Sequence, residues 1–367
     1  MTEDRSTENK HTYVAIMAGG IGSRFWPVSR TSYPKQFLDI LDTGKTFIQQ
    51  TVERFLKFVP LQNIYVVTAD EYVDLTKEQL PLLPAENIVS EPFRKNTAPC
   101  IAYISFKLQQ KDADATLIVA PADHLILDEA KFGAVCNEAI SFADRYKALL
   151  TLGIKPTNPN TGYGYIQHED QHIENSLYKV KTFTEKPNKE LAKTFLSSGD
   201  FLWNAGIFIW KVATCLDAFQ QHLPEMYELF AAEQESFNTP RERAAIESIY
   251  PQCTNISIDF GVMEKADNVY VIPASFGWSD LGTWCSAWEN IEHDYFGNAV
   301  TGEKVIVFDT ANSMIHTQAG KLAVVQGLDD FIVVDTKDVL LICQKEKEQE
   351  IKEYVAEVKR NMGDKYL

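Results

Sequence analysis

Residues 12–24 read TYVAIMAGGIGSR, and this stretch decides how the first part of the chain folds. The run 12–18 is apolar, rich in β-formers and ends at glycines, which is typical of a buried parallel strand. Similar runs recur at 63–69 and 115–121, and residues 128–143 follow with a helical period. Strands alternating with helices predict an α/β fold, in which an open, mostly parallel sheet carries helices on both sides.

Three glycines, Gly19, Gly20 and Gly22, follow the first predicted strand directly. Ligands of such sheets bind beyond the carboxyl ends of the strands. A backbone without side chains can point its N–H groups at phosphate oxygens. A tight turn that needs positive φ is the alternative explanation. The nearby cations Arg24 and Lys35 favour an anion as the ligand.

Two well-known phosphate loops do not fit this sequence. A Walker loop, GxxxxGK[ST], could end at residues 44–46, but Asp39 stands where its first glycine belongs. We therefore expect residues 44–46 to form a turn before a helix at 47–58. A dinucleotide fingerprint, GxGxxG, could start at Gly20, but Phe25 occupies the position of the third glycine.

The composition excludes several classes of partner. The 367 residues include 35 basic and 51 acidic side chains, which give a net charge of −16. Such a surface repels phosphate backbones and anionic lipid, so we expect neither nucleic acid nor a membrane as partner. No apolar run is long enough for a transmembrane helix or a secretion signal. Six cysteines without a CxxC pair predict reduced thiols and a cytoplasmic protein.

The pattern changes twice along the second half of the chain. Strand-like runs at 161–167, 178–187 and 201–210 predict an extension of the sheet. From about residue 297, short β segments separated by Gly, Asp, Asn and Thr predict a small domain of stacked rungs or a meander. A helix near 348–362 should close this domain. Its predicted buried stripe consists of Ile351, Tyr354, Val355, Val358 and Met362.

The glycine segment also has a familiar sequence. AGGIGSRFWPVSRTSYPKQF (18–37) resembles the signature of sugar-phosphate nucleotidylyltransferases. Its WPxSR and PKQF parts resemble the mannose-1-phosphate guanylyltransferases, also called GDP-mannose pyrophosphorylases. Ser23 replaces the usual threonine and Phe25 the usual leucine, so a hydroxyl and an apolar body are retained.

Seven further matches follow in the order of that family, so the resemblance covers residues 13–290. They are EPFRKNTAPCIAY (91–103), PADH (121–124), GYGYI (162–166), FTEKP (183–187), WNAGIF (203–208), SIDFGVMEK (257–265) and GWSDLGTW (277–284).

The resemblance implies a fold and a reaction. The fold is a Rossmann-like catalytic domain of the nucleotide-diphospho-sugar transferase type at 12–292, with a short left-handed β-helix at 297–367. The reaction transfers GMP from GTP to mannose 1-phosphate, giving GDP-mannose and pyrophosphate with the help of Mg²⁺. Longer relatives carry a phosphomannose isomerase domain as well, which we do not expect here. The sequence does not set the assembly, for which a homodimer is one candidate.

By resemblance, five residues carry the catalysis. Arg24 and Lys35 would hold the triphosphate and the departing pyrophosphate, and Asp123 and Asp280 would bind Mg²⁺. Taken alone, an aspartate after a strand is more often a helix cap. Lys186 completes the catalytic set by holding the phosphate of the sugar.

The remaining assignments concern the sugar and the base. Glu185 would bind mannose hydroxyls, with Gly164 and Asn204 at the other sugar-contacting positions. Without the family, EKP would be a surface turn and Asn204 a satisfied buried amide. Guanine presents N–H donors, so its site needs acceptors. The residues expected to bind the nucleotide are Ala18, Gly19, Gly20, Gly22, Ser23, Arg24, Asn96, Thr97 and Asp123.

Two alternatives differ from this hypothesis. One is a pyrophosphorylase for another sugar 1-phosphate or another nucleoside triphosphate, against which the WPxSR, PKQF and NTAP segments argue. The other is a non-catalytic regulatory subunit that binds nucleotide sugar. Such a subunit would be expected to lose cations or carboxylates, whereas all five catalytic residues are present.

Overall fold

The computed structural model describes residues 10–174 and 176–367. They divide into two compact units. The first unit contains residues 10–19, 52–122 and 126–278, except residue 175. The second unit contains residues 20–51, 123–125 and 279–367.

The first unit is built on a nine-stranded sheet with the order β3-β2-β1-β4-β9-β6-β10-β8-β7. Three of these strands confirm the strands predicted at 12–18, 63–69 and 115–121. Their apolar side chains are buried on both faces, as expected for central parallel strands. The bounds are β1 Thr12–Met17, β2 Ile64–Ala69, β3 Ile88–Glu91, β4 Thr116–Pro121, β6 Leu149–Ile154, β7 Tyr165–Glu174, β8 Leu177–Thr184, β9 Phe201–Lys211 and β10 Val269–Ala274.

The directions of the strands confirm a mostly parallel sheet. β1 pairs in parallel with β2 and β4, β2 with β3, and β6 with β10. β9 runs antiparallel to both β4 and β6 and so joins two parallel halves. The carboxyl ends of β1, β3 and β4 are followed by Gly19, Asn96 and Asp123, as the predicted position of a ligand requires.

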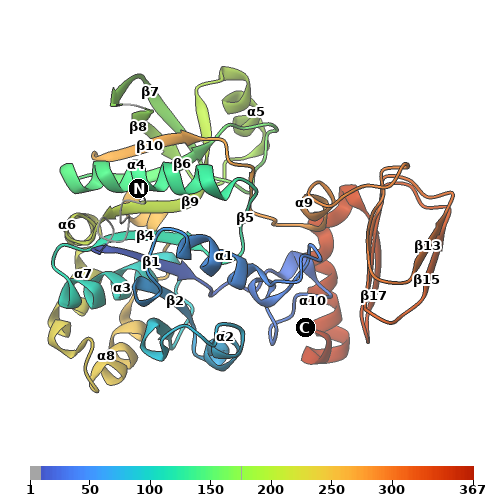
Figure 1. Cartoon of the computed structure of the whole chain (residues 1–367), viewed down its shortest axis with the longest axis horizontal. Coiled ribbons are helices and arrows are strands. Elements are labelled where there is room, and N and C mark those ends of the chain that lie inside the picture. The colour runs from blue at the N-terminus through green and yellow to red at the C-terminus, as the bar shows by residue number, and fades with distance from the viewer. Residues whose placement is uncertain (1–9, 175) are drawn as a thin grey trace, which may run out of the picture. The chain divides into compact units, whose positions relative to one another are not determined.

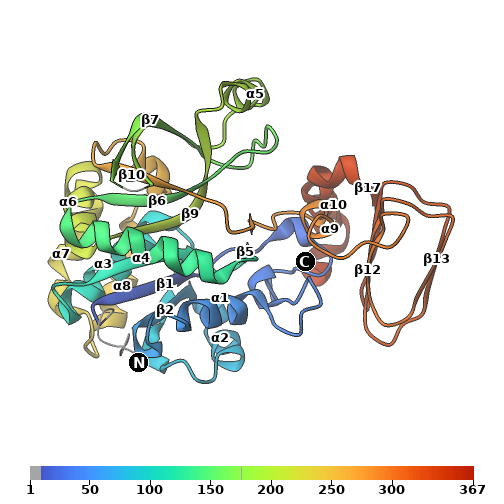
Figure 2. The ribbon, with the colours of Figure 1, turned by 45° about the horizontal axis from the view of Figure 1, so that its top comes forward.

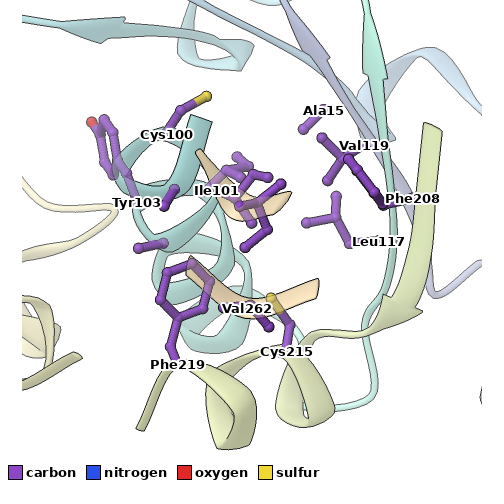
Figure 3. Close-up of a cluster of buried hydrophobic side chains, with 14 of the residues drawn as sticks. Ala15, Cys100, Ile101, Tyr103, Leu117, Val119, Phe208, Cys215, Phe219 and Val262 are labelled. Carbon is purple, nitrogen blue, oxygen red and sulfur yellow. The ribbon is translucent and has the colours of Figure 1, made fainter. Parts of the chain in front are cut away.

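Helices cover this sheet. In Figures 1 and 2, α4 (Glu129–Arg145) lies along one face of the sheet, and it confirms the helix predicted at 128–143. Figure 3 shows Ile101 of α3 packing among side chains of β1, β4, β9 and α6, including Leu117, Phe208 and Phe219. The other bounds are α2 Val73–Gln79, α3 Thr97–Lys111, α5 Lys189–Ser198, α6 Val212–His222, α7 Pro224–Ala232 and α8 Glu242–Ile249.

The second unit contains a stack of short strands. β12 pairs in parallel with β14, and β14 with β16, which aligns Ala299, Met314 and Ile332 in one fully buried row. β13 and β15 pair in parallel as well, and β17 ends the stack antiparallel to β16. The prediction of stacked rungs is confirmed. The bounds are β12 Ala299–Thr301, β13 Val305–Phe308, β14 Met314–Thr317, β15 Ala323–Gln326, β16 Phe331–Asp335 and β17 Leu340–Gln344.

Two helices, α9 (Trp284–Trp288) and α10 (Ile351–Met362), belong to the second unit. Ile351 is fully buried, but Met362 is 66% exposed, so the predicted stripe was wrong at its last position. Met362 is the final residue of α10, where the helix has no further turn to pack. Three elements include residues of both units: α1 Phe47–Leu56, β5 Leu125–Ile126 and β11 Trp278–Ser279. Within the described ranges, every helix is too short or too polar to cross a bilayer.

Candidate active site

In the loop that follows β1, a side chain is excluded at Gly22 but has room at Gly20. Gly22 has a φ of +69°, and a Cβ there would lie 2.4 Å from Cβ of Lys35. A side chain is therefore excluded at Gly22 by conformation and by space, as the tight-turn explanation requires. At Gly20, in contrast, an added Cβ would meet no atom within 4 Å. The space beside Gly20 leaves its backbone open to a ligand.

Arg24 lies in a 3₁₀ turn, Ser23–Phe25, that begins directly after Gly22. Its Nε is buried and has no hydrogen-bond partner among the residues that the structure describes. A buried donor without an acceptor costs free energy, and the cost falls when an anion supplies the acceptor. This arrangement suits the predicted role of Arg24 as a phosphate ligand.

Lys35 brings together parts of the chain that are far apart in sequence. Its Nζ donates to the backbone oxygen and to Oδ2 of Asp123, both at 3.0 Å, and to the backbone oxygen of Asp280 at 2.7 Å. The Lys35 side chain is only 3% exposed and lies between the rings of Phe25 and Phe47. We call Lys35, Asp123 and Asp280 the Lys35 centre. All three ammonium protons are used within it.

The charge of Asp123 is set by this centre. Burial alone would raise the pKa of the Asp123 carboxyl, but the charges of Lys35 and His124 lower it below its usual range. Asp123 is therefore an anion at neutral pH, although 32% of its side chain is exposed. An ionised, partly exposed carboxylate is a suitable ligand for a hard cation.

Asp280 joins the Lys35 centre through its backbone oxygen, and its side chain is a second carboxylate of the same unit. Its Oδ1 accepts a hydrogen bond from Gly282 N at 3.1 Å. Among the described residues there is no group of three or more His, Cys, Asp and Glu that could hold a metal ion. Mg²⁺ does not require one, because it commonly takes one or two carboxylates and fills its other positions with substrate phosphates and water. The oxygen donors of Asp123 and Asp280 fit that preference.

The rejected Walker-like tail is a turn, as predicted. Asp39, which stands where the first glycine of a Walker loop would be, accepts hydrogen bonds from Thr43 N at 2.9 Å and Gly44 N at 2.6 Å. A carboxylate thus occupies the amides of Thr43 and Gly44, which a phosphate would need in a Walker-like loop.

The predicted sugar residues meet in the first unit. A Cβ at Gly164 would lie 2.5 Å from Oε2 of Glu185 and 3.3 Å from Cβ of Asn204. Glu185 is 8% exposed and forms an ion pair with Lys186, whose side chain is 63% exposed. We call Gly164, Glu185, Lys186 and Asn204 the Glu185 group. It offers a carboxylate acceptor, an accessible ammonium and a backbone without a side chain.

Asn204 is held by partners that the sequence analysis did not single out. Its Oδ1 accepts from Thr151 Oγ1 at 2.8 Å and from Gly206 N at 3.1 Å. Its Nδ2 donates to Oδ1 of Asp259 at 3.0 Å. Most of the amide is thus hydrogen-bonded within the protein, which agrees with the alternative explanation that Asn204 is a satisfied amide. One Nδ2 proton is left for a ligand.

Asn96 and Thr97 begin α3 in the first unit, where both residues also serve as caps. Oδ1 of Asn96 accepts from Thr97 N at 2.9 Å, and Oγ1 of Thr97 accepts from Ile258 N at 2.9 Å. Asn96 itself is exposed and has a φ of +68°. The backbone of Ala18 bonds to Val67 and Thr68, both of β2.

Glu91 lies at the carboxyl end of β3, beside Gly19, and the sequence analysis gave it no role. A Cβ on Gly19 would be 3.8 Å from Oε2 of Glu91. Oε1 accepts from the hydroxyl of Tyr250 at 2.8 Å, whereas Oε2 has no hydrogen bond within the described part of the chain. Burial raises the pKa of Glu91 to about 7. Its place at the start of EPFRKNTAP was the signal that could have identified it.

Comparison with known proteins places these residues in a family. The sequence model described as nucleotidyl transferase matches residues 13–295, and that described as MannoseP isomerase/GMP-like beta-helix domain matches residues 303–358. The alginate biosynthesis protein AlgA of Pseudomonas syringae pv. tomato is 38% identical over 346 residues, which are 93% of this chain and 70% of AlgA.

Two further relatives are similar along nearly the whole chain. The mannose-1-phosphate guanylyltransferase of Escherichia coli K12 is 35% identical over 355 residues, which are 95% of this chain and 73% of that protein. A crystal structure described as mannose-1-phosphate geranyltransferase from Thermus thermophilus has a TM-score of 0.84 and 29% identity. The match covers 95% of this chain and 99% of that one.

Proposed function

The chain belongs to the nucleotidyl transferase family, and we infer that it is a mannose-1-phosphate guanylyltransferase. It transfers GMP from GTP to mannose 1-phosphate and releases GDP-mannose and pyrophosphate. The structural observation that carries this conclusion is the Lys35 centre, in which three predicted catalytic residues from distant parts of the sequence meet.

The chemistry needs charge neutralisation rather than a base. A phosphate oxygen of mannose 1-phosphate attacks the α-phosphorus of GTP, a new P–O bond forms, and the bond between the α-phosphorus and the oxygen of the β-phosphate breaks. The attacking oxygen is already anionic, so no proton has to be removed. The barrier lies in the approach of two polyanions and the departure of pyrophosphate, so cations and N–H donors must supply the catalysis.

We assign the triphosphate to the second unit of the chain. The open backbone at Gly20, the hydroxyl of Ser23 and the Nε of Arg24, which lacks an acceptor among the described residues, are the donors that support this assignment. Lys35 would contact pyrophosphate only after releasing one of its three present acceptors. Its first task is therefore to hold Asp123 and the segment of Asp280 in place.

Members of the family generally use a divalent metal. We propose that Mg²⁺ is the metal here, with Asp123 and Asp280 as the protein ligands. When bound, Mg²⁺ would neutralise charge on the phosphates. The ionised state of Asp123 supports this assignment.

We assign the sugar phosphate to the Glu185 group of the first unit. Lys186 is the accessible cation for the 1-phosphate, and Glu185 is an acceptor for sugar hydroxyls. Gly164 has no side chain that would fill the space between Glu185 and Asn204.

Recognition of guanine requires acceptors for N1–H and for the 2-amino group. We propose that the carboxyl of Glu91, together with Asn96, Thr97 and the backbone at Ala18 and Gly19, provides them. Oε2 of Glu91, which has no donor within the described ranges, supports this role, because two donors from guanine would stabilise a buried carboxylate.

Location and assembly are further proposals. All six cysteines are free thiols, which favours a reducing compartment, and we propose the cytoplasm. A homodimer is the assembly that we propose to test first, by light scattering.

Pyrophosphate release over a grid of four nucleoside triphosphates and several hexose 1-phosphates tests the function. The expected result is a clear maximum for GTP with mannose 1-phosphate in the presence of Mg²⁺. A maximum for another pair would replace the substrates, and no release with any pair would favour a non-catalytic role.

A further inference from the structure

Asp259 has no role in the reaction described so far, although it belongs to the SIDFGVMEK segment. It is the first residue of a π-helix, Asp259–Met263. Such helices are rare and frequently occur at functional sites. Asp259 is half-buried and contacts the Glu185 group through Asn204.

The contact between Asp259 and Asn204 has a defined direction. Gly206 N, which can only donate, points at one end of the Asn204 amide and identifies that end as the oxygen. The amide nitrogen therefore faces Oδ1 of Asp259. An oxygen at this position of residue 259 fixes the amide, whether the carboxyl is neutral or charged.

The charges around Asp259 are mostly negative. Burial raises the pKa of Asp259 to about 7, the Glu185 carboxylate raises it too, and the charge of Lys186 and the bond from Asn204 oppose them. Glu264, whose carboxylate accepts from Glu185 N, is close as well, and burial raises its pKa. Lys186 is the cation that acts on Asp259, and Lys265 acts on Glu264.

We propose that Asp259 is a positioning residue that orients Asn204 and, through its ionisation, controls the affinity for the sugar phosphate. This proposal rests on the function inferred above. When Asp259 is neutral, the charge of Lys186 is opposed by its ion pair with Glu185 and by nearby Glu264. Ionised Asp259 adds a further negative charge near Lys186, the group that receives the 1-phosphate.

The direction of the pH dependence follows from this charge. Below pH 7 the Asp259 carboxyl is mainly neutral, and the sugar phosphate meets less repulsion. Above pH 7 it is mainly ionised, so the KM for mannose 1-phosphate should rise. We expect a rise of about tenfold between pH 6 and pH 8.5, since one unit charge at several ångströms has an effect of this order.

The experiment compares the wild type with Asp259→Asn over that pH range. Asparagine keeps an oxygen for the Asn204 amide but cannot ionise. Its KM for mannose 1-phosphate should vary less with pH than that of the wild type, while kcat and the KM for GTP follow the wild type. Asp259→Ala should raise the KM at every pH because Asn204 loses its partner. The second ionisation of the substrate affects all variants alike.

Asp267→Asn is the matched control, because Asp267 is an exposed carboxylate on the segment that follows. It should keep the wild-type pH profile. If Asp259→Asn does not fold, proton uptake by the wild type on binding mannose 1-phosphate at pH 8, measured by calorimetry in two buffers, replaces it. A sizeable fraction of a proton is expected, and no uptake would overturn the proposal.

A pH profile of Asp259→Asn that matches the wild type would overturn the role of Asp259 alone. Absence of turnover by the wild type with GTP and mannose 1-phosphate would overturn the proposed function and this role together.

Discussion

Lys35 combines a structural and an electrostatic task in one side chain. Its ammonium satisfies acceptors on Asp123 and Asp280, and its aliphatic stem excludes a side chain at Gly22. The PKQF motif predicted Lys35 as a catalytic residue. It could not show that the lysine would be buried, since burial depends on the rings of Phe25 and Phe47 packing around it.

Replacing Lys35 should affect stability as well as turnover. Lys35→Met leaves Asp123 without its cation, so we expect a loss of about 1–3 kcal/mol in the free energy of unfolding and no measurable turnover. Lys45→Met, which removes an exposed lysine of the same unit, should change neither by much. Urea denaturation and pyrophosphate release measure the two effects. Wild-type stability in Lys35→Met would contradict the buried contacts.

The ion pair between Lys35 and Asp123 should make the free energy of unfolding depend on pH. The pKa of Asp123 is lower in the folded chain than in the unfolded one, so its contribution is present above the unfolded pKa of about 3.9 and is lost as the pH falls through the folded value. The destabilisation of Lys35→Met relative to the wild type should therefore shrink below about pH 4. A constant difference in urea midpoint from pH 3 to pH 7 would argue against the ion pair.

The two kinds of glycine in the loop should respond differently to alanine. Gly22→Ala meets both a positive φ and the Lys35 side chain, and we expect it to cost roughly 2–4 kcal/mol of stability. Gly20→Ala has open space and should cost less than about 1 kcal/mol. Thermal unfolding of both variants checks this order. Equal losses would show that the space beside Gly20 is filled.

Glu91 should determine how strongly the protein prefers guanine to hypoxanthine, the base of ITP. Glu91→Gln replaces a pure acceptor by a group that also donates, so the preference for GTP over ITP, which lacks the 2-amino group, should fall by roughly tenfold. Glu86→Gln, which changes an exposed carboxylate just before the start of β3, should keep the wild-type ratio of kcat/KM values. An unchanged ratio in Glu91→Gln would remove Glu91 from the base site.

At the scale of elements, the strands at 12–18, 63–69 and 115–121 were predictable because a central parallel strand is a continuous apolar run. The antiparallel direction of β9 between β4 and β6 was not predictable. The apolar sequence of residues 201–210 indicates a buried strand, but the direction of that strand depends on partner strands far away in the chain. The π-helix at Asp259–Met263 also left no periodic pattern, since it is only five residues long.

The start of α3 offers a test of one element. Asn96 caps the helix and also holds a φ of +68° that glycine adopts more easily. Asn96→Ala loses the cap and strains the backbone, so we expect a loss of about 1–2 kcal/mol in the free energy of unfolding. Asn96→Gly should lose less, because glycine tolerates this φ. The reverse order in urea denaturation would contradict the capping geometry.

At the scale of the whole molecule, the compact units cut across the order of the sequence. Residues 20–51 share a unit with the C-terminal part because Phe25 and Trp26 belong to one buried cluster with Trp284 and Ile332. No local pattern reports such long-range packing. The sequence domains at 12–292 and 297–367 describe a different division and stay a prediction.

The motifs identified residues that lie together in the structure, but not every residue that contacts them. Lys35, Asp123 and Asp280 were assigned from sequence and meet in one centre. Asp259 and Glu91 were not assigned, although both stand in quoted motifs. Their raised pKa values arise from burial, which a sequence read residue by residue does not show.

The most direct test of the central claim follows oxygen atoms through the reaction. Mannose 1-phosphate labelled with ¹⁸O at its three non-bridging phosphate oxygens is incubated with GTP, Mg²⁺ and the protein, and the products are analysed by mass spectrometry. If a sugar-phosphate oxygen attacks the α-phosphorus of GTP, GDP-mannose keeps all three labels and pyrophosphate carries none. Label in released phosphate or pyrophosphate, or no GDP-mannose at all, would contradict the account.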